Sequence, residues 1–324
     1  MRADDALTHL LYMSTTYRPA FGAPPLRRLT VHHKTTYRYK RPVTFGQHRL
    51  MFRPRDSFDL RVLDAKIAIT PNAELRWLHD VFGNSVAIAR FTEAGDTLSF
   101  DAEIVIDRHF SAAPEFPIEA FARQIPFSYP ASEVPELGRS IERHFSDPDR
   151  KVTEWTRQFL ASVNGNTSTE DFLLALTTGI RNSFVYETRD EEGVQSPVET
   201  LQRWQGSCRD FAVLMMEAVR SVGLAARFVS GYLYDPAIDG GESDTTGAGA
   251  THAWVQVYLP GAGWIEFDPT NGSYGGANLV PVAVAREPAQ AVPISGAYDG
   301  SAEDFLDMSV DVSVHSVRIG NDDA

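Results

Sequence analysis

The sequence predicts an α+β protein in which an antiparallel β-sandwich domain precedes a second unit of helices and sheet. Three observations support this prediction. Short segments rich in β-branched and aromatic residues, separated by turn signals, fill the first third of the chain. Helical patterns occupy the middle, and the most amphipathic of them is followed by further strand-like segments. The short, evenly spaced strands at the start are typical of a sandwich.

Each element follows from a local pattern. Strands are expected over 31–39, 61–70, 86–91 and 97–106, helices near Pro135 and Thr153, and a third helix from Thr169 with Ser168 or Thr169 as its cap. A last strand is expected within 306–317, where apolar residues alternate. The expected organisation is a flexible leader (1–27), the β-sandwich N-terminal domain (28–112), a connector with helices (113–160), the core (161–275) and a C-terminal extension (276–324).

Composition limits the classes of function. The 324 residues exceed what one core usually holds, and the composition is that of a soluble globular protein. The net charge of −13 argues against a general nucleic-acid binder, whose phosphate contacts need a basic surface. The stretch from Arg27 to Arg55 nevertheless holds nine Lys or Arg and no acid. It is either a solvated strand face or a docking patch for an acidic partner.

The single cysteine, Cys208, excludes an intramolecular disulfide and a multi-cysteine zinc site, and favours a reducing compartment. The N-terminal residues lack the pattern of a secretory signal, and no run approaches the ~18 apolar residues of a membrane helix. We therefore expect a cytoplasmic protein without membrane contact. The oligomeric state is not predictable from the sequence.

Cys208 is expected at the first position of an amphipathic helix. Ser207 is a suitable N-cap, Asp210 falls at the third helical position, and Gly223 can end the helix. The apolar face is Phe211, Leu214, Met215, Ala218, Val219 and Val222. Unpaired N–H groups and the helix dipole at this end favour a thiolate.

His252 and Asp268 are expected on one face of a hairpin. His252 opens a strand with Trp254 and Gln256 on its face and aliphatic residues opposite, and we expect the polar face to line a cleft. If Tyr258 pairs with Trp264 on the next strand, His252 lies diagonal to Asp268, within reach of side chains. A thiol that attacks amides needs a base oriented by a third group, and these three residues could supply them. Each alone has a simpler interpretation as a core cysteine, a structural histidine and a turn aspartate.

Several motifs together resemble the transglutaminase-like superfamily, specifically its bacterial branch of transglutaminase-like cysteine proteases. They are Gly206-Ser207-Cys208-Arg209-Asp210-Phe211-Ala212, the segment 223–232, Thr251-His252-Ala253-Trp254-Val255, and Gly263-Trp264-Ile265-Glu266-Phe267-Asp268-Pro269-Thr270. Segments 37–39, 42–43, 48–50 and 80–84 resemble the β-rich N-terminal domain of that branch. The resemblance implies a papain-like transglutaminase core with Cys208 as nucleophile, His252 as base and Asp268 as orienting residue. It also implies an oxyanion donor, for which Tyr186 and Trp204 are candidates, while Trp254 is a candidate for the cleft wall.

The resemblance implies acyl transfer through a thioester on a peptide or protein substrate. Hydrolysis of a peptide, isopeptide or glutamine amide is favoured over transamidation to an amine, and a non-catalytic partner-binding module is a further alternative. We expect no cofactor or metal. Asp235, Asp239, Glu242 and Asp244 lack the spacing of a calcium loop, and His32 and His33 point to opposite faces of a strand.

Overall fold

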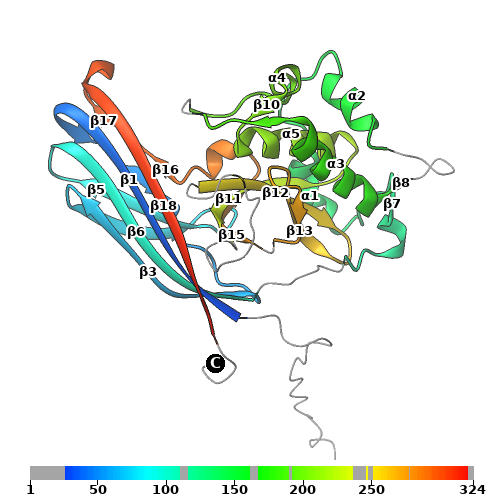
Figure 1. Ribbon diagram of the computed structural model, residues 1–324, viewed down its shortest axis with the longest axis horizontal. Helices are drawn as coiled ribbons and strands as arrows, with labels where there is room; N and C mark the ends of the chain where they lie inside the picture. The colour runs from blue at the N-terminus through cyan, green and yellow to red at the C-terminus, as the bar shows by residue number, and fades with distance from the viewer. Residues whose placement is uncertain are drawn as a thin grey trace, which may run out of the picture.

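The structure, a computed structural model, describes residues 26–109, 116–160, 167–189, 192–235, 246, 251–276 and 278–319. Figure 1 shows long strands curving along one side of the molecule, with helices and a shorter sheet on the other side. Nearly all of the expected leader, 1–27, lies outside the described residues.

The long strands form the expected antiparallel sandwich. In β6 (Gly95–His109) nearly every second residue is buried, as a strand with one face on a core requires. The core between the two sheets includes Leu29, Leu50, Ala89 and Phe100. One sheet contains β1 (Leu26–Phe45), β3 (Leu60–Thr70), β6, β17 (Tyr298–Asp299) and β18 (Phe305–Arg318); the other contains β2 (His48–Leu50), β4 (Ala73–His79), β5 (Ser85–Phe91) and β16 (Ile294–Ser295).

The C-terminal segment belongs to this sandwich. The strand expected within 306–317 is present as β18, which runs antiparallel along β1 (Figure 1). Val312 and Val314 of β18 are buried in the sandwich core. Segments from both ends of the described chain therefore build one domain, with the helical part between them. Two 3₁₀ turns, η3 (Pro288–Gln290) and η4 (Ala302–Asp304), lie in the segment that leads to β18.

Acidic residues of neighbouring strands and turns contact the basic stretch between Arg27 and Arg55. Ion pairs join Arg28 to Asp107 at 2.7 Å, Arg41 to Asp304 at 2.8 Å and Arg49 to Asp80 at 3.0 Å. Such partly exposed pairs contribute about 1 kcal/mol or less each. They nevertheless offset part of the positive charge that suggested an acidic partner.

The middle of the chain supplies the helices. Three begin close to the predicted positions, and Ser168 caps the third by accepting from Asp171 N. The short helix capped by Ser196 was not predicted. No helix of the described residues is long and apolar enough to cross a membrane. The elements are η1 (Ala120–Ala122), β7 (Gln124–Ile125), α1 (Val134–Ile141), α2 (Lys151–Arg157), β8 (Thr167–Ser168), α3 (Thr169–Ser183), β9 (Val185–Tyr186), α4 (Pro197–Arg203), β10 (Gln205–Gly206) and α5 (Cys208–Ser221).

A further sheet, separate from the two sheets of the sandwich, forms the centre of the core. Its order is β14-β13-β12-β11-β15, and Tyr258 pairs with Trp264 as expected. The aliphatic face of β12, with Val255 and Val257, is buried in one cluster with residues of α5. The strands are β11 (Ala226–Leu233), β12 (Thr251–Leu259), β13 (Gly263–Asp268), β14 (Ser273–Tyr274) and β15 (Leu279–Ala285).

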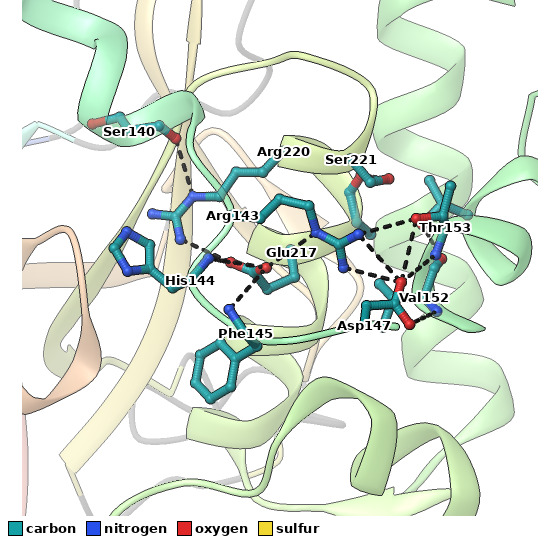
Figure 2. A network of polar contacts seen from close by, with 12 residues as sticks. Ser140, Arg143, His144, Phe145, Asp147, Val152, Thr153, Glu217, Arg220 and Ser221 are labelled. Carbon is teal, nitrogen blue, oxygen red and sulfur yellow. Dashed lines mark hydrogen bonds and ion pairs between the residues drawn. The ribbon is translucent and has the colours of Figure 1, made fainter. Parts of the chain in front are cut away.

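A buried carboxylate fastens the connector to α5 (Figure 2). Glu217 accepts hydrogen bonds from Arg220 at 3.0 Å, from Arg143 at 3.3 Å and from the backbone N–H of His144 at 3.1 Å. Arg143 also donates to Asp147 at 3.2 Å. Because Glu217 has no exposed surface, these contacts replace the water that the charge has lost. The network thus holds in place the helix that carries Cys208 at its first position.

Candidate active site

Cys208 begins α5 as predicted, with Ser207 as the N-cap residue. The Asp210 carboxylate accepts hydrogen bonds from the backbone N–H of Ser207 at 2.8 Å and from its hydroxyl at 2.9 Å. Gly206 lies directly before Ser207, and a Cβ added at Gly206 would lie only 2.9 Å from the Cβ of Asp210. The thiol is buried, with 7% of its residue surface exposed. The local sequence therefore places one thiol rigidly at the positive end of a helix.

Asp210 also holds the loop that precedes α4. Its carboxylate accepts hydrogen bonds from Arg189 at 2.9 Å and from the backbone N–H of Gln195 at 2.7 Å. Asp210 is fully buried, and its hydrogen bonds connect this loop to the start of α5. The sequence predicted Asp210 as a residue of the first helical turn but not its contacts with Arg189 and Gln195.

His252 and Asp268 form a buried pair. His252 Nε2 lies 2.8 Å from Asp268 Oδ2, and both side chains have no exposed surface. Asp268 also accepts from Asn271 Nδ2 at 2.8 Å and from the backbone N–H of Thr270 at 2.9 Å. Burial favours the neutral acid, but the neighbouring His252 and these hydrogen bonds outweigh it and lower the pKa of Asp268. The carboxylate is thus charged and fixed.

The imidazole of His252 is held as a cation. Burial alone would lower its pKa, but Asp268 first, and then Cys208, raise the pKa of His252 to about 10. Nε2 is taken by Asp268, so Nδ1 is the ring nitrogen left for the thiol. Nδ1 has no partner of standard hydrogen-bond geometry among the described residues. The three residues that sequence reasoning selected are therefore brought together, with the imidazole between the thiol and the carboxylate.

The three further candidates lie in different environments. Tyr186, on β9, is half-buried, and burial followed by the charge of Cys208 raises its pKa to about 12, so its hydroxyl remains a donor. Trp204 is half exposed and stacks on Phe184 at 4.9 Å between ring centroids. Tyr186 therefore lies within the electrostatic range of Cys208.

The expectation that Trp254 lines a cleft is wrong. Trp254 is fully buried and packs against Val229, Leu233 and Leu279, with its ring stacked 6.0 Å from that of His252. The same face of the sheet carries Glu266, whose carboxylate lies 4.0 Å from Arg108 of β6. The N-terminal domain therefore contacts this face, which sequence alternation within one hairpin could not reveal.

Asn271 is a site residue that sequence reasoning missed. It donates to Asp268, and its Oδ1 accepts from the backbone N–H of Thr246 at 2.8 Å. Its position directly after the Asp-Pro-Thr segment was a usable signal, because Asn in such a turn often bonds nearby polar groups. No cluster of metal-ligating side chains occurs within the described residues. Asp239, Glu242 and Asp244 lie outside them.

Comparison with known proteins identifies the chain. Residues 157–269 match the model of the transglutaminase-like superfamily, and residues 29–107 match that of the bacterial transglutaminase-like N-terminal region. The chain is a member of the transglutaminase-like superfamily. Cys208, His252 and Asp268 all lie in the segment that matches the transglutaminase-like core.

The chain is similar to other proteins along most of its length. An uncharacterized protein of Mycobacterium tuberculosis is 29% identical over 299 residues, which cover 88% of this chain and 92% of the relative. One from Mycobacterium leprae is 25% identical over 304 residues, covering 88% of this chain and 98% of the relative. The crystal structure of a candidate cysteine protease from Cytophaga hutchinsonii is similar with a TM-score of 0.63 at 19% identity. It covers 92% of this chain and 93% of that one, so the transglutaminase-like fold with its N-terminal domain is shared as a whole.

Proposed function

We propose that the protein is a cysteine enzyme that transfers acyl groups from amide bonds through a thioester. Hydrolysis of a peptide, isopeptide or glutamine amide is the favoured outcome. The observation that carries the proposal is the buried 2.8 Å pair of His252 and Asp268 beside the only thiol of the chain, which begins a helix. A charged imidazole between a thiol and a carboxylate stabilises a thiolate, the nucleophilic form of cysteine.

In the proposed reaction the sulfur of Cys208 attacks the amide carbonyl carbon, and a C–S bond forms. The C–N bond then breaks, and the proton on His252 Nδ1 passes to the departing amine. Water attacks the thioester, gives its proton back to Nδ1, and releases the acid and the thiolate. Asp268 holds the imidazole in one orientation throughout.

Two groups could stabilise the oxyanion in this scheme. The backbone N–H of Cys208 lies in the first turn of α5, where no intrahelical acceptor exists. The hydroxyl of Tyr186 is protonated at neutral pH and lies in the electrostatic range of Cys208. Donors fixed in advance near the developing charge are worth about 10²–10³ in rate each. Tyr186→Phe should therefore lower kcat more than it changes KM.

The test uses wild-type protein and Cys208→Ala with a peptide library and a small primary amine, read by mass spectrometry. We expect cleaved or deamidated products from the wild type and none from the variant, whose thermal melt should be unchanged. Amine-tagged products in place of hydrolysed ones would assign transamidation. If no product depended on Cys208 across a broad substrate set, the protein would instead be a partner-binding module.

A cytoplasmic location belongs to the same proposal. A lone functional thiol is best preserved in a reducing compartment. Fractionation of cells that make the full-length protein, with a periplasmic or secreted marker for comparison, tests it.

A further inference from the structure

A cavity of about 450 Å³ lies away from the candidate active site. It is bordered by Phe82 of the N-terminal domain, by Glu133 and Leu137 at the start of α1, and by Tyr258 and Trp264 of the core sheet. His252 and Tyr258 are six residues apart on β12, which corresponds to about 20 Å along a strand. The cavity is thus at the far end of the strand that carries His252.

Arg227 lines this cavity as a partly buried cation. Its guanidinium carbon lies 4.1 Å from the centroid of the Trp264 ring, and its Nε donates to Gln256 Oε1 at 2.7 Å. Gln256 is neutral, and among the described residues no carboxylate lies within ion-pair distance of Arg227. Burial lowers the pKa of Arg227 to about 10, so the guanidinium is still charged at neutral pH.

The two other arginines that border the cavity have acidic partners. Arg139 pairs with Glu142 at 2.6 Å, and Arg286 pairs with Glu287 at 2.6 Å. Two carboxylates also border the cavity: Glu133, which accepts from the hydroxyl of Tyr258 at 2.8 Å, and Glu136. Among the described residues Arg227 is therefore the cation of this cavity that makes no ion pair, although the charge of Glu266 lies within its electrostatic range. Sequestering a charge from water is unfavourable unless an opposite charge or hydrogen bonds replace the lost solvation.

We propose that this cavity binds a carboxylate, which accepts two hydrogen bonds from the terminal nitrogens of Arg227. The planar guanidinium fork matches the two oxygens of a carboxylate, and Trp264 fixes its orientation from one side. Phe82 and Leu137 give the cavity an apolar wall for a group attached to the carboxylate. The volume is within the range of small-molecule sites and can hold a residue-sized group.

Two sources share this chemistry, namely a free small carboxylic acid and the C-terminal residue of a peptide. Calorimetric titration of the full-length protein with N-acetylphenylalanine and with N-acetylphenylalanine amide tests the carboxylate itself. We expect saturable binding of the acid and none of the amide. Equal binding of both, or no binding of the acid up to its solubility limit, would overturn the proposal.

Variants locate the site. Arg227→Gln should weaken binding of the acid by about 10- to 100-fold, because it removes the charged donors. Arg227→Lys keeps the charge but loses the fork, so an intermediate loss is expected. Arg203→Gln, on the exposed face of α4 and paired with Glu199, is the matched control and should bind normally. Thermal melts establish that each variant is folded, and unchanged affinity in both Arg227 variants would contradict the assignment.

Further ligands separate the sources and keep this proposal distinct from the catalytic one. A tripeptide with a free C-terminal phenylalanine that binds more tightly than the acetylated residue would assign a peptide terminus, and equal affinity a small acid. Tighter binding of inorganic phosphate than of either would exclude a carboxylate site. The Cys208→Ala variant should bind like the wild type, so loss of the proposed catalytic function leaves this result unaffected.

Discussion

Two buried carboxylates on one helix, Asp210 and Glu217, show how similar chemistry can serve different ends. They are seven residues apart on α5, about two turns, and neither has exposed surface. Each accepts hydrogen bonds from an arginine and from backbone N–H groups. In energetic terms they are alike, because each is a buried charge whose lost hydration is replaced by donors.

The segments that they hold are different. Asp210 connects the residue before the thiol, Ser207, to the loop that contains Arg189 and Gln195. Glu217 connects the middle of α5 to the connector, through Arg143 and the backbone of His144 (Figure 2). Burial of an acidic residue is therefore not sufficient to identify a functional site. What distinguishes Asp210 is that its partners surround the end of the helix where Cys208 lies.

The largest effect is expected for Glu217→Gln. The substitution keeps the shape but leaves Arg143 and Arg220 without their shared counter-charge, which should lower the free energy of unfolding by about 3–5 kcal/mol. Urea denaturation measures this. Glu199→Gln is the matched control, because Glu199 pairs with Arg203 on an exposed helix face and should cost about 1 kcal/mol or less.

A second measurement on Glu217→Gln distinguishes an effect on the candidate active site from an effect on the stability of the fold. Iodoacetamide can report only on Cys208, because the chain has no other thiol. Its rate of alkylation in folded Glu217→Gln should match the wild type. A large decrease without unfolding would show that Glu217 acts on the site after all, and the contrast with Asp210 would fail.

Asp210→Asn should have the opposite profile. Asp210 is paired with one arginine, Arg189, whereas Glu217 is paired with two, so we expect a smaller loss of unfolding free energy, about 1–3 kcal/mol. The pairing with Arg189 is lost, the loop shifts, and alkylation of Cys208 and any turnover should fall by up to about 10²-fold, as small misplacements of reacting groups do. Asp171→Asn, an exposed acid in the first turn of α3, should change neither rate. Normal reactivity in Asp210→Asn would remove Asp210 from the site.

The contrast also shows how far the sequence could predict the site. The cap of α5 is local, so Ser207 and Asp210 were identified from spacing alone. The register of the hairpin followed from its short loop, which was enough to bring His252 and Asp268 together. Glu217 was missed because helical periodicity assigns a polar residue to solvent, whereas its partner Arg143 is 74 residues away in the chain.

The errors in the predicted fold have similar causes. β15 was not predicted, because Pro281 interrupts its pattern; in the structure the proline lies beside a register shift between Ser230 and Gly231 of β11. Trp254 was placed in a cleft because alternation shows which residues share a face but not what covers that face. Contacts between distant segments decide both cases, and a single sequence contains no direct signal of them.

The pH dependence of stability distinguishes Asp268 from the two acids of α5. Asp210 and Glu217 are paired with arginines, which keep their protons up to high pH. The partner of Asp268 is His252, whose pKa rises from about 6.5 when unfolded to about 10 when folded. The stability from this pair is fully present below about pH 6.5 and is lost as the pH rises towards 10. Between these pH values the contribution of the pair to the free energy of unfolding should fall by up to about 1.4 kcal/mol per pH unit.

The measurement compares Cys208→Ser with the double variant Cys208→Ser, His252→Gln by urea denaturation at pH 7, 8 and 9. Replacing the thiol leaves the larger contribution of Asp268 to the pKa of His252 and removes the titration of the cysteine. The difference in unfolding free energy between the two proteins should shrink with each step in pH. A constant difference would mean that His252 is neutral in the folded protein. The imidazole could then act only as a base towards the thiol, because it would carry no proton for the leaving amine at the start of the reaction.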